Sequence, residues 1–152
     1  MKKYILLTCL TLLTGLCQAQ IPQSQILPEP GEWQKPGMGI MLYNDRSVRM
    51  DFESGANYIE AEGQWTVEHE GKYADTVKLT MTVVAWIGGS KDRRIDLTPR
   101  APAKFVAYLI KTPNGVQSVN SVYITSGTRM INLNILALQR GRASATRPNG
   151  NG

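Results

Sequence analysis

Cysteine and histidine are scarce in this sequence. Cys9 and Cys17 are the only cysteines among 152 residues, and His69 is the only histidine. Residues 20–152 therefore contain no thiol for a disulfide, for thiol catalysis or for a cysteine-type zinc site. A domain without disulfides is held together by the burial of apolar side chains, so the sequence predicts a substantial hydrophobic core.

Long apolar runs are also missing, apart from one at the very start. That run covers residues 4–16, follows two lysines and precedes the small residues of Cys17-Gln18-Ala19. It is too short to span a bilayer and has the layout of a secretory signal peptide cleaved after Ala19. We therefore expect a bacterial product that is periplasmic or secreted, with no transmembrane segment after residue 19. The alternative is a lipoprotein anchored through Cys17, but Leu16 is bulky where that processing favours a small residue.

Charge is distributed unevenly along the chain. Residues 45–75 carry eight acidic and three basic side chains, whereas residues 76–152 carry eleven basic and two acidic ones. Acidic strands paired with basic neighbours across a sheet would explain this segregation, and we favour that interpretation because sheet neighbours are often distant in sequence. The alternative is a molecule with two oppositely charged faces, suited to head-to-tail assembly. Nucleic acid is not an expected partner of an exported chain with so modest a net charge.

Alternating apolar residues predict β-strands throughout the chain. The strongest pattern covers residues 76–87, where stiff Val and Thr side chains favour a strand over a helix. Its core-facing side chains are expected to be Val77, Leu79, Met81, Val83, Ala85 and Ile87. Similar strand patterns occupy residues 39–43, 47–52, 58–70, 93–97, 104–111, 116–125 and 129–138, with a bulge expected at Gly63 and a tight hairpin at Asn114-Gly115.

About seven or eight such strands without helical periodicity predict an all-β fold. The expected architecture is an antiparallel β-sandwich, immunoglobulin-like in shape, with a small β-barrel as the alternative. We expect a signal peptide at 1–19, a Pro/Gln-rich extended arm at 20–37, the β-sandwich domain at 38–139 and a disordered basic tail at 140–152. The arm is expected to be a linker, and the alternative is a strand donated to a neighbouring subunit.

One group of basic residues surrounds a short strand and is the leading candidate for a binding surface. Paired guanidinium contacts there would suit an acidic polysaccharide, a lipid headgroup or an acidic protein surface. The members of this basic cluster are Trp86, Lys91, Arg93, Arg94, Arg100 and Lys104.

Catalytic constellations are weak. Glu60 and Glu62 share one face of a predicted strand about 7 Å apart, which is a separation that glycosidases use, but any polar strand face produces it. The flanking glutamates of His69 point to the opposite face of a strand, so we expect His69 to face solvent. We therefore expect no enzyme activity, no cofactor and no metal site, with a hydrolase using Glu60 and Glu62 as the alternative.

A short stretch carries a family resemblance. Ser54-Gly55-Ala56-Asn57-Tyr58, with Trp65-Thr66 downstream, resembles the Ser-Gly-x-x-Tyr stretch of periplasmic C-type lysozyme inhibitors, which are small β-barrel proteins. The resemblance implies that Ser54 and Tyr58 lie on a loop that enters the lysozyme cleft. It covers about a dozen residues, and the paired cysteines of that family are absent here.

Together these patterns favour a protein that works through its surface. We expect an exported, non-enzymatic accessory or structural subunit of a bacterial envelope or appendage assembly, with protein partners or further copies of itself. The alternative is a soluble periplasmic inhibitor or ligand-binding module that uses the Ser54–Tyr58 loop.

Overall fold

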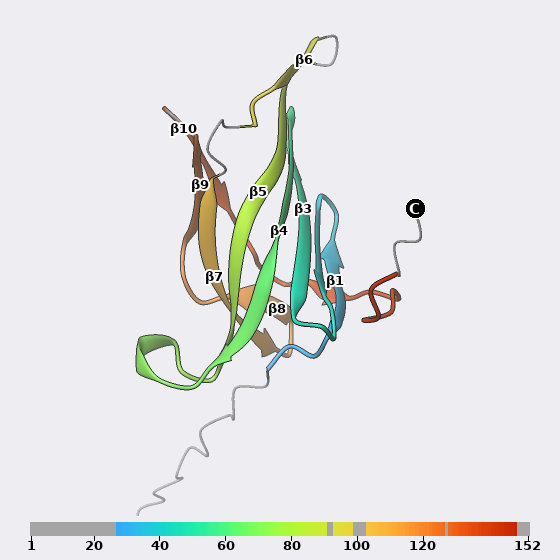
Figure 1. The fold of residues 1–152 in the computed structure, drawn as a ribbon, viewed down its shortest axis with the longest axis vertical. Coiled ribbons are helices and arrows are strands. Elements are labelled where there is room, and N and C mark those ends of the chain that lie inside the picture. The colour runs from blue at the N-terminus through green and yellow to red at the C-terminus, as the bar shows by residue number, and fades with distance from the viewer. Residues whose placement is uncertain (1–26, 91–92, 99–102, 127, 149–152) are drawn as a thin grey trace, which may run out of the picture.

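The computed structural model describes residues 27–90, 93–98, 103–126 and 128–148, and this part of the chain is built almost entirely from antiparallel β-strands (Figure 1). One short 3-10 turn, η1 (Gly71–Tyr73), connects the two longest strands. The strands are β1 (Gly31–Lys35), β2 (Met38–Leu42), β3 (Ser47–Ser54), β4 (Asn57–Glu68), β5 (Thr76–Ser90), β6 (Arg93–Asp96), β7 (Lys104–Thr112), β8 (Gly115–Ser118), β9 (Val122–Ser126), β10 (Arg129–Leu133) and β11 (Gln139–Arg140).

The principal sheet curls until its two edges nearly meet. Its strand order is β11-β1-β2-β3-β4-β5-β7-β8, with β6 also paired to β5. At the seam, Val116 of β8 exchanges two backbone hydrogen bonds of 2.9 Å with Leu138, which directly precedes β11. The all-β, antiparallel prediction is confirmed, and the sheet is nearly closed into a barrel.

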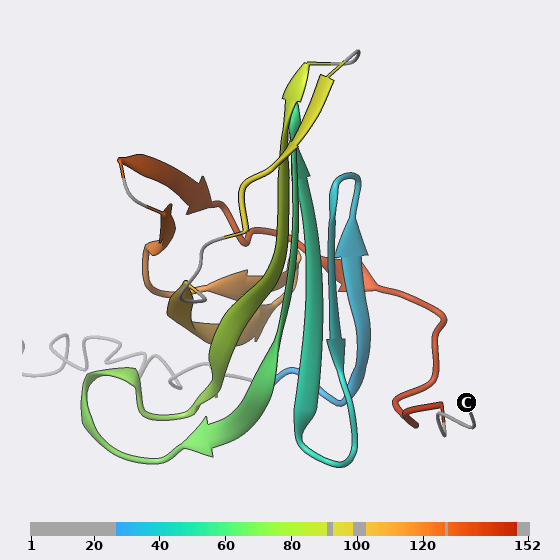
Figure 2. The same cartoon turned by 45° about the horizontal axis from the view of Figure 1, so that its top comes forward.

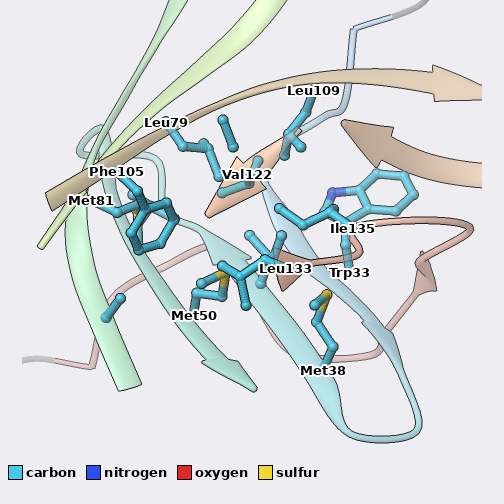
Figure 3. Close-up of a cluster of buried hydrophobic side chains, with 14 of the residues drawn as sticks. Trp33, Met38, Met50, Leu79, Met81, Phe105, Leu109, Val122, Leu133 and Ile135 are labelled. Atoms are coloured by element: carbon cyan, nitrogen blue, oxygen red, sulfur yellow. The ribbon is translucent and has the colours of Figure 1, made fainter. Parts of the chain in front are cut away.

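A separate pair of strands, β9 and β10, covers part of the interior. Val122, Ile124 and Leu133 of this pair are buried, and Figure 3 shows Val122 and Leu133 among side chains of the principal sheet. The core contains aliphatic, methionine and aromatic side chains. The residues labelled in Figure 3 are Trp33, Met38, Met50, Leu79, Met81, Phe105, Leu109, Val122, Leu133 and Ile135.

β5 departs from the predicted alternation at a β-bulge. Glu60 lies opposite Ala85 and Ala61 lies opposite Val83, so Val84 is the extra residue. The bulge changes which side chains point inward: Val84 is 45% exposed, whereas Trp86 is 1% exposed. Alternation therefore holds from Val77 to Val83, but the expectation that Ala85 and Ile87 lie in the core is wrong, since both are only half-buried.

Gly63 is required for close approach between strands rather than for a bulge. β4 runs unbroken from Asn57 to Glu68, so the bulge expected at Gly63 lies instead on the partner strand. A Cβ atom at position 63 would collide with the backbone carbonyl oxygen of Thr80 on β5. Only glycine lets the two central strands lie this close.

Two segments expected to be irregular have defined contacts with the sheet. Residues 31–35 of the expected arm form β1, where Trp33 is buried and its indole N–H donates to the carbonyl oxygen of Glu29. Residues 141–148 of the expected tail contain no strand, but Gly141 donates to the carbonyl of Glu32 and the amide of Asn44 donates to the carbonyl of Ala145.

The last two predicted strands are shorter than expected because the chain turns within each. The segment 116–125 divides into β8 and β9 at Asn120, whose side-chain amide donates to Val106 and accepts from the amide of Tyr108. This side chain takes the place of a neighbouring strand along the edge of β7. The segment 129–138 ends its regular pairing at Leu133.

Hairpin ends gather at one end of the barrel. The β3–β4 and β5–β6 hairpins and the β9–β10 pair all point toward the upper end in Figure 1, and the turned view in Figure 2 shows β5–β6 extending beyond the rest. In the part of the chain that the structure describes, no helix is long and apolar enough to cross a bilayer.

Candidate functional site

The basic cluster expected from the sequence is not assembled as one surface around Trp86. Trp86 lies in the core, where its indole N–H donates to Asn57 at 3.3 Å, so its ring is not available to a ligand. The Cα atoms of Arg93 and Arg94 on β6 lie opposite Ser90 and Gly89 of β5. Lys91 and Arg100 fall outside the described residues.

Lys104 is exposed but lies far from β6. It begins β7 opposite Thr82, seven residues along β5 from the partner of Arg94. At 3.3 Å per residue this is roughly 23 Å. The described members of the basic cluster therefore do not form one continuous site with Lys104.

The loop that resembles the inhibitor motif is the tip of the β3–β4 hairpin. Ser54 pairs with Asn57, and the exposed Gly55 between them has a φ of 58°. Tyr58 is half-buried, and its hydroxyl donates to Glu60 at 3.3 Å. Partial burial, followed by the charge and hydrogen bond of Glu60, raises the pKa of the Tyr58 phenol. Ser54 is thus presented at an exposed tip, while Tyr58 is bound to its own sheet.

An acidic surface covers the outer face of β3 and β4. Glu60 forms an ion pair of 2.7 Å with Arg49. Glu62 is exposed on the same face, as the alternation of side chains along this strand predicted. Asp51 lies directly opposite Glu60. Partial burial raises the pKa of Asp51; Arg49 opposes this effect, and Glu60 and other nearby carboxylates add to it. Glu60 is thus held by Arg49 and Tyr58 on an open strand face.

Ion pairs explain little of the charge segregation. Of the salt bridges among described residues, Lys78–Glu68 at 3.4 Å joins the acidic stretch 45–75 to the basic stretch that follows. Arg49–Glu60 lies within the acidic stretch, and Lys111–Glu29 lies outside it. The favoured interpretation, pairing of acidic with basic strands, thus applies to one described ion pair. His69 is exposed beside this region, as expected.

A polar groove crosses the outer face of the three central strands. It is an open depression of about 530 Å³, with a floor of residues from β3, β4 and β5 and a wall formed by Tyr43 and the C-terminal segment. The residues that line it through their outward side chains are Tyr43, Ser47, Arg49, Glu62, Gln64, Thr82, Val84, Arg147 and Pro148. We call this feature the tail groove.

The C-terminal segment is fixed where it forms the groove wall. The Glu32 carboxylate accepts from the amide of Ala143 at 3.1 Å, and Ala145 accepts from Asn44 at 3.0 Å. The Arg147 guanidinium lies 6.0 Å from the centre of the Tyr43 ring, within the range of a cation–π contact. No local sequence pattern predicts this groove, because its wall comes from a segment of low hydropathy that contacts the sheet through single hydrogen bonds.

Among the described residues, no three His, Cys, Asp or Glu side chains are grouped as a metal ion would require. Comparisons of this chain with models of known families, with curated proteins and with solved structures found no match.

Proposed function

We propose that this chain is an exported, non-enzymatic subunit that acts through protein contacts in a bacterial envelope or appendage assembly. The observation that carries the proposal is the set of hairpin ends in the upper part of the barrel: β3–β4, β5–β6 and, to one side of them, β9–β10 (Figure 2). Exposed apolar side chains occur on the two hairpins that flank this end: Ile95 of β6 is 44% exposed, Tyr123 of β9 is 46% exposed and Met130 of β10 is 66% exposed.

Strand edges at this end are also unpaired. Among described residues β6 pairs with β5 alone, and β10 pairs with β9 alone. An unpaired edge presents backbone N–H and C=O groups that a strand of another protein can complete. Apolar side chains next to such an edge add area for a specific contact. The basic, apolar start of the sequence supports export of the product.

Size-exclusion chromatography with light scattering, at low and high salt, tests this proposal. We expect the processed chain to form an oligomer or to co-purify with a defined envelope protein, and Met130→Lys to weaken that association at least tenfold. The matched control is Val84→Lys, which places the same charge at an equally apolar, exposed site on a different face and should leave association unchanged. A monomer without any co-purifying protein at either salt concentration would contradict the proposal.

A second candidate function follows from the exposure of the β3–β4 tip. Ser54, the last residue of β3, and Gly55, which follows it in the turn, are both exposed at the hairpin tip, as entry into another protein's cleft requires. The test is inhibition of a C-type lysozyme by the parent chain and by Ser54→Ala and Tyr58→Phe. Inhibition that both substitutions weaken would support the inhibitor role, and no inhibition by the parent chain would end it.

A further inference from the structure

The tail groove has the layout of a small-ligand site. Two rows of side chains cross the strands: Arg49, Glu62 and Thr82 lie opposite one another in the first row, and Ser47 and Gln64 lie opposite one another in the second. The rows are two residues apart along each strand, which is about 7 Å. A volume of about 530 Å³ lies within the range of pockets that hold small molecules.

The bulge in β5 shapes one end of this groove. Because Val84 is the extra residue of the bulge, its side chain points outward, as that of Thr82 does two residues earlier on β5. Val84 therefore forms the end of the groove floor on β5. At the other end, Tyr43 and Pro148 supply an aromatic ring and an apolar ring. The groove is therefore polar along its floor and bounded by apolar surface at both ends.

Charge differs between the two ends of the groove. Arg147 stands at the tail end and forms no ion pair with a described carboxylate. Asp45 lies near enough that, after its hydrogen bonds with Ser47, the charge of Arg147 helps to lower the pKa of that carboxyl, so a bound anion would compete with Asp45. Glu62 stands on β4 in the first row, between Arg49 and Thr82, and also has no ion pair among the described residues. Arg49, beside Glu62, is occupied by Glu60. One end thus offers a guanidinium for an anionic group, and the rest offers acceptors and neutral donors.

We propose that the tail groove binds a short oligosaccharide with one acidic sugar at its end. The carboxylate of that sugar pairs with Arg147, whose planar guanidinium suits a two-point contact. The neutral sugars lie over β3 to β5, where Gln64, Thr82 and Glu62 provide the donors and acceptors that hydroxyl groups need. Tyr43 supplies an aromatic surface for the apolar face of a sugar ring.

A peptide fits these observations less well. Peptides bind β-sheets mainly by adding a strand at an edge, and this groove crosses the outer face of central strands whose backbone groups are already paired. Recognition in the groove must therefore come from side chains. The hydroxyl, amide and carboxylate groups along its floor match a ligand rich in hydroxyl groups.

Titration of the processed chain with three probes tests the proposal, with binding followed by calorimetry and by NMR shifts of backbone amides. The probes are 3′-sialyllactose, which has one acidic sugar on a neutral disaccharide; lactose, which lacks the acidic sugar; and the peptide Gly-Gly-Glu, which has carboxylates but no hydroxyl groups. We expect sialyllactose to bind with a Kd of about 1 mM or tighter, and at least tenfold more tightly than either other probe. The shifts should be concentrated at residues 43–49, 62–64 and 82–84.

Variants with matched controls locate the site. Arg147→Gln should weaken sialyllactose binding about tenfold, whereas Arg142→Gln removes the same charge from an exposed tail position outside the groove and should change it less than twofold. Gln64→Ala should also weaken binding, and Thr66→Ala, on the same face of β4 beyond the groove, should not. All four positions are exposed, so the far-ultraviolet circular dichroism of each variant should match that of the parent.

Three results would overturn the proposal. The first is no binding of sialyllactose at about ten times the expected Kd. The second is an equal loss of sialyllactose affinity in Arg147→Gln and Arg142→Gln, which would mean that the ligand is attracted by the overall charge of the protein rather than bound in the groove. The third is binding of Gly-Gly-Glu as tight as that of sialyllactose, which would make the groove a peptide site. These outcomes are independent of whether the hairpin end assembles with other proteins.

Discussion

Replacement of Gly63 by alanine should separate the two central strands of the sheet. The added Cβ would meet the carbonyl oxygen of Thr80, which is backbone and cannot move aside as a side-chain end can. Overpacking of this kind costs about 1–3 kcal/mol. Each ladder hydrogen bond lost as β4 moves away adds about 1 kcal/mol. The lower entropy of the unfolded alanine chain offsets about 0.4–1 kcal/mol of this cost.

The net expectation is a loss of about 3 kcal/mol in the free energy of unfolding, or about 10 °C in Tm. Urea unfolding of the processed chain, followed by tryptophan fluorescence, measures this loss. Gly55→Ala is the matched control, because position 55 has a φ of 58° but no neighbouring atom within 4 Å. It should lose only about 1 kcal/mol, from backbone strain. If Gly63→Ala were no more destabilising than Gly55→Ala, the close approach of β4 and β5 would be refuted.

Three further substitutions test other features. Trp86→Ala should lower the free energy of unfolding by about 3–5 kcal/mol, as expected for a core residue. Urea unfolding measures this loss, and a variant as stable as the parent would contradict the burial of Trp86. Asn120→Ala should lower stability by about 2 kcal/mol and speed hydrogen exchange of the Tyr108 amide in particular, since that amide loses its acceptor; unchanged exchange would refute this role. Asp51→Asn should raise stability at pH 7. The raised pKa of Asp51 means that the folded state holds the proton more tightly than the unfolded state, so stability falls as the pH rises from the ordinary value of 3.8 through the raised value. The stability gained from Asn should therefore vanish in unfolding curves below pH 3.8. A gain that persists there would contradict the upward direction of the pKa shift.

Local sequence patterns were sufficient to predict most of the strands. The pattern predicted β5 correctly from Val77 to Val83, because the alternation of inward and outward side chains follows from the local sequence alone. A hairpin was also predicted after β7, and β7 and β8 are indeed joined by one, but the two connecting residues are Pro113 and Asn114 rather than Asn114 and Gly115, because Gly115 pairs with Thr112 as the first residue of β8.

Features that depend on a partner strand were not predictable. The bulge at Val84 exists only because β4 and β5 pair in a particular register, and that register decides whether Trp86 points inward. This is why Trp86 was expected on a binding surface. The tail groove depends on a hydrogen bond between Asn44 and Ala145, about a hundred positions apart, which no local pattern encodes.

The pairing of β1 with β11 limits when the sheet can be completed during folding. β1 is paired on one side with β11, so Trp33 and Arg140 are neighbours although more than a hundred residues separate them in the chain. Ordering so long an intervening stretch before those contacts form is entropically unfavourable, and contacts of this kind slow folding. During synthesis the outer edge of β1 therefore stays uncovered until β11 has been made, more than a hundred residues later, even though the hairpins between consecutive strands can pair before then.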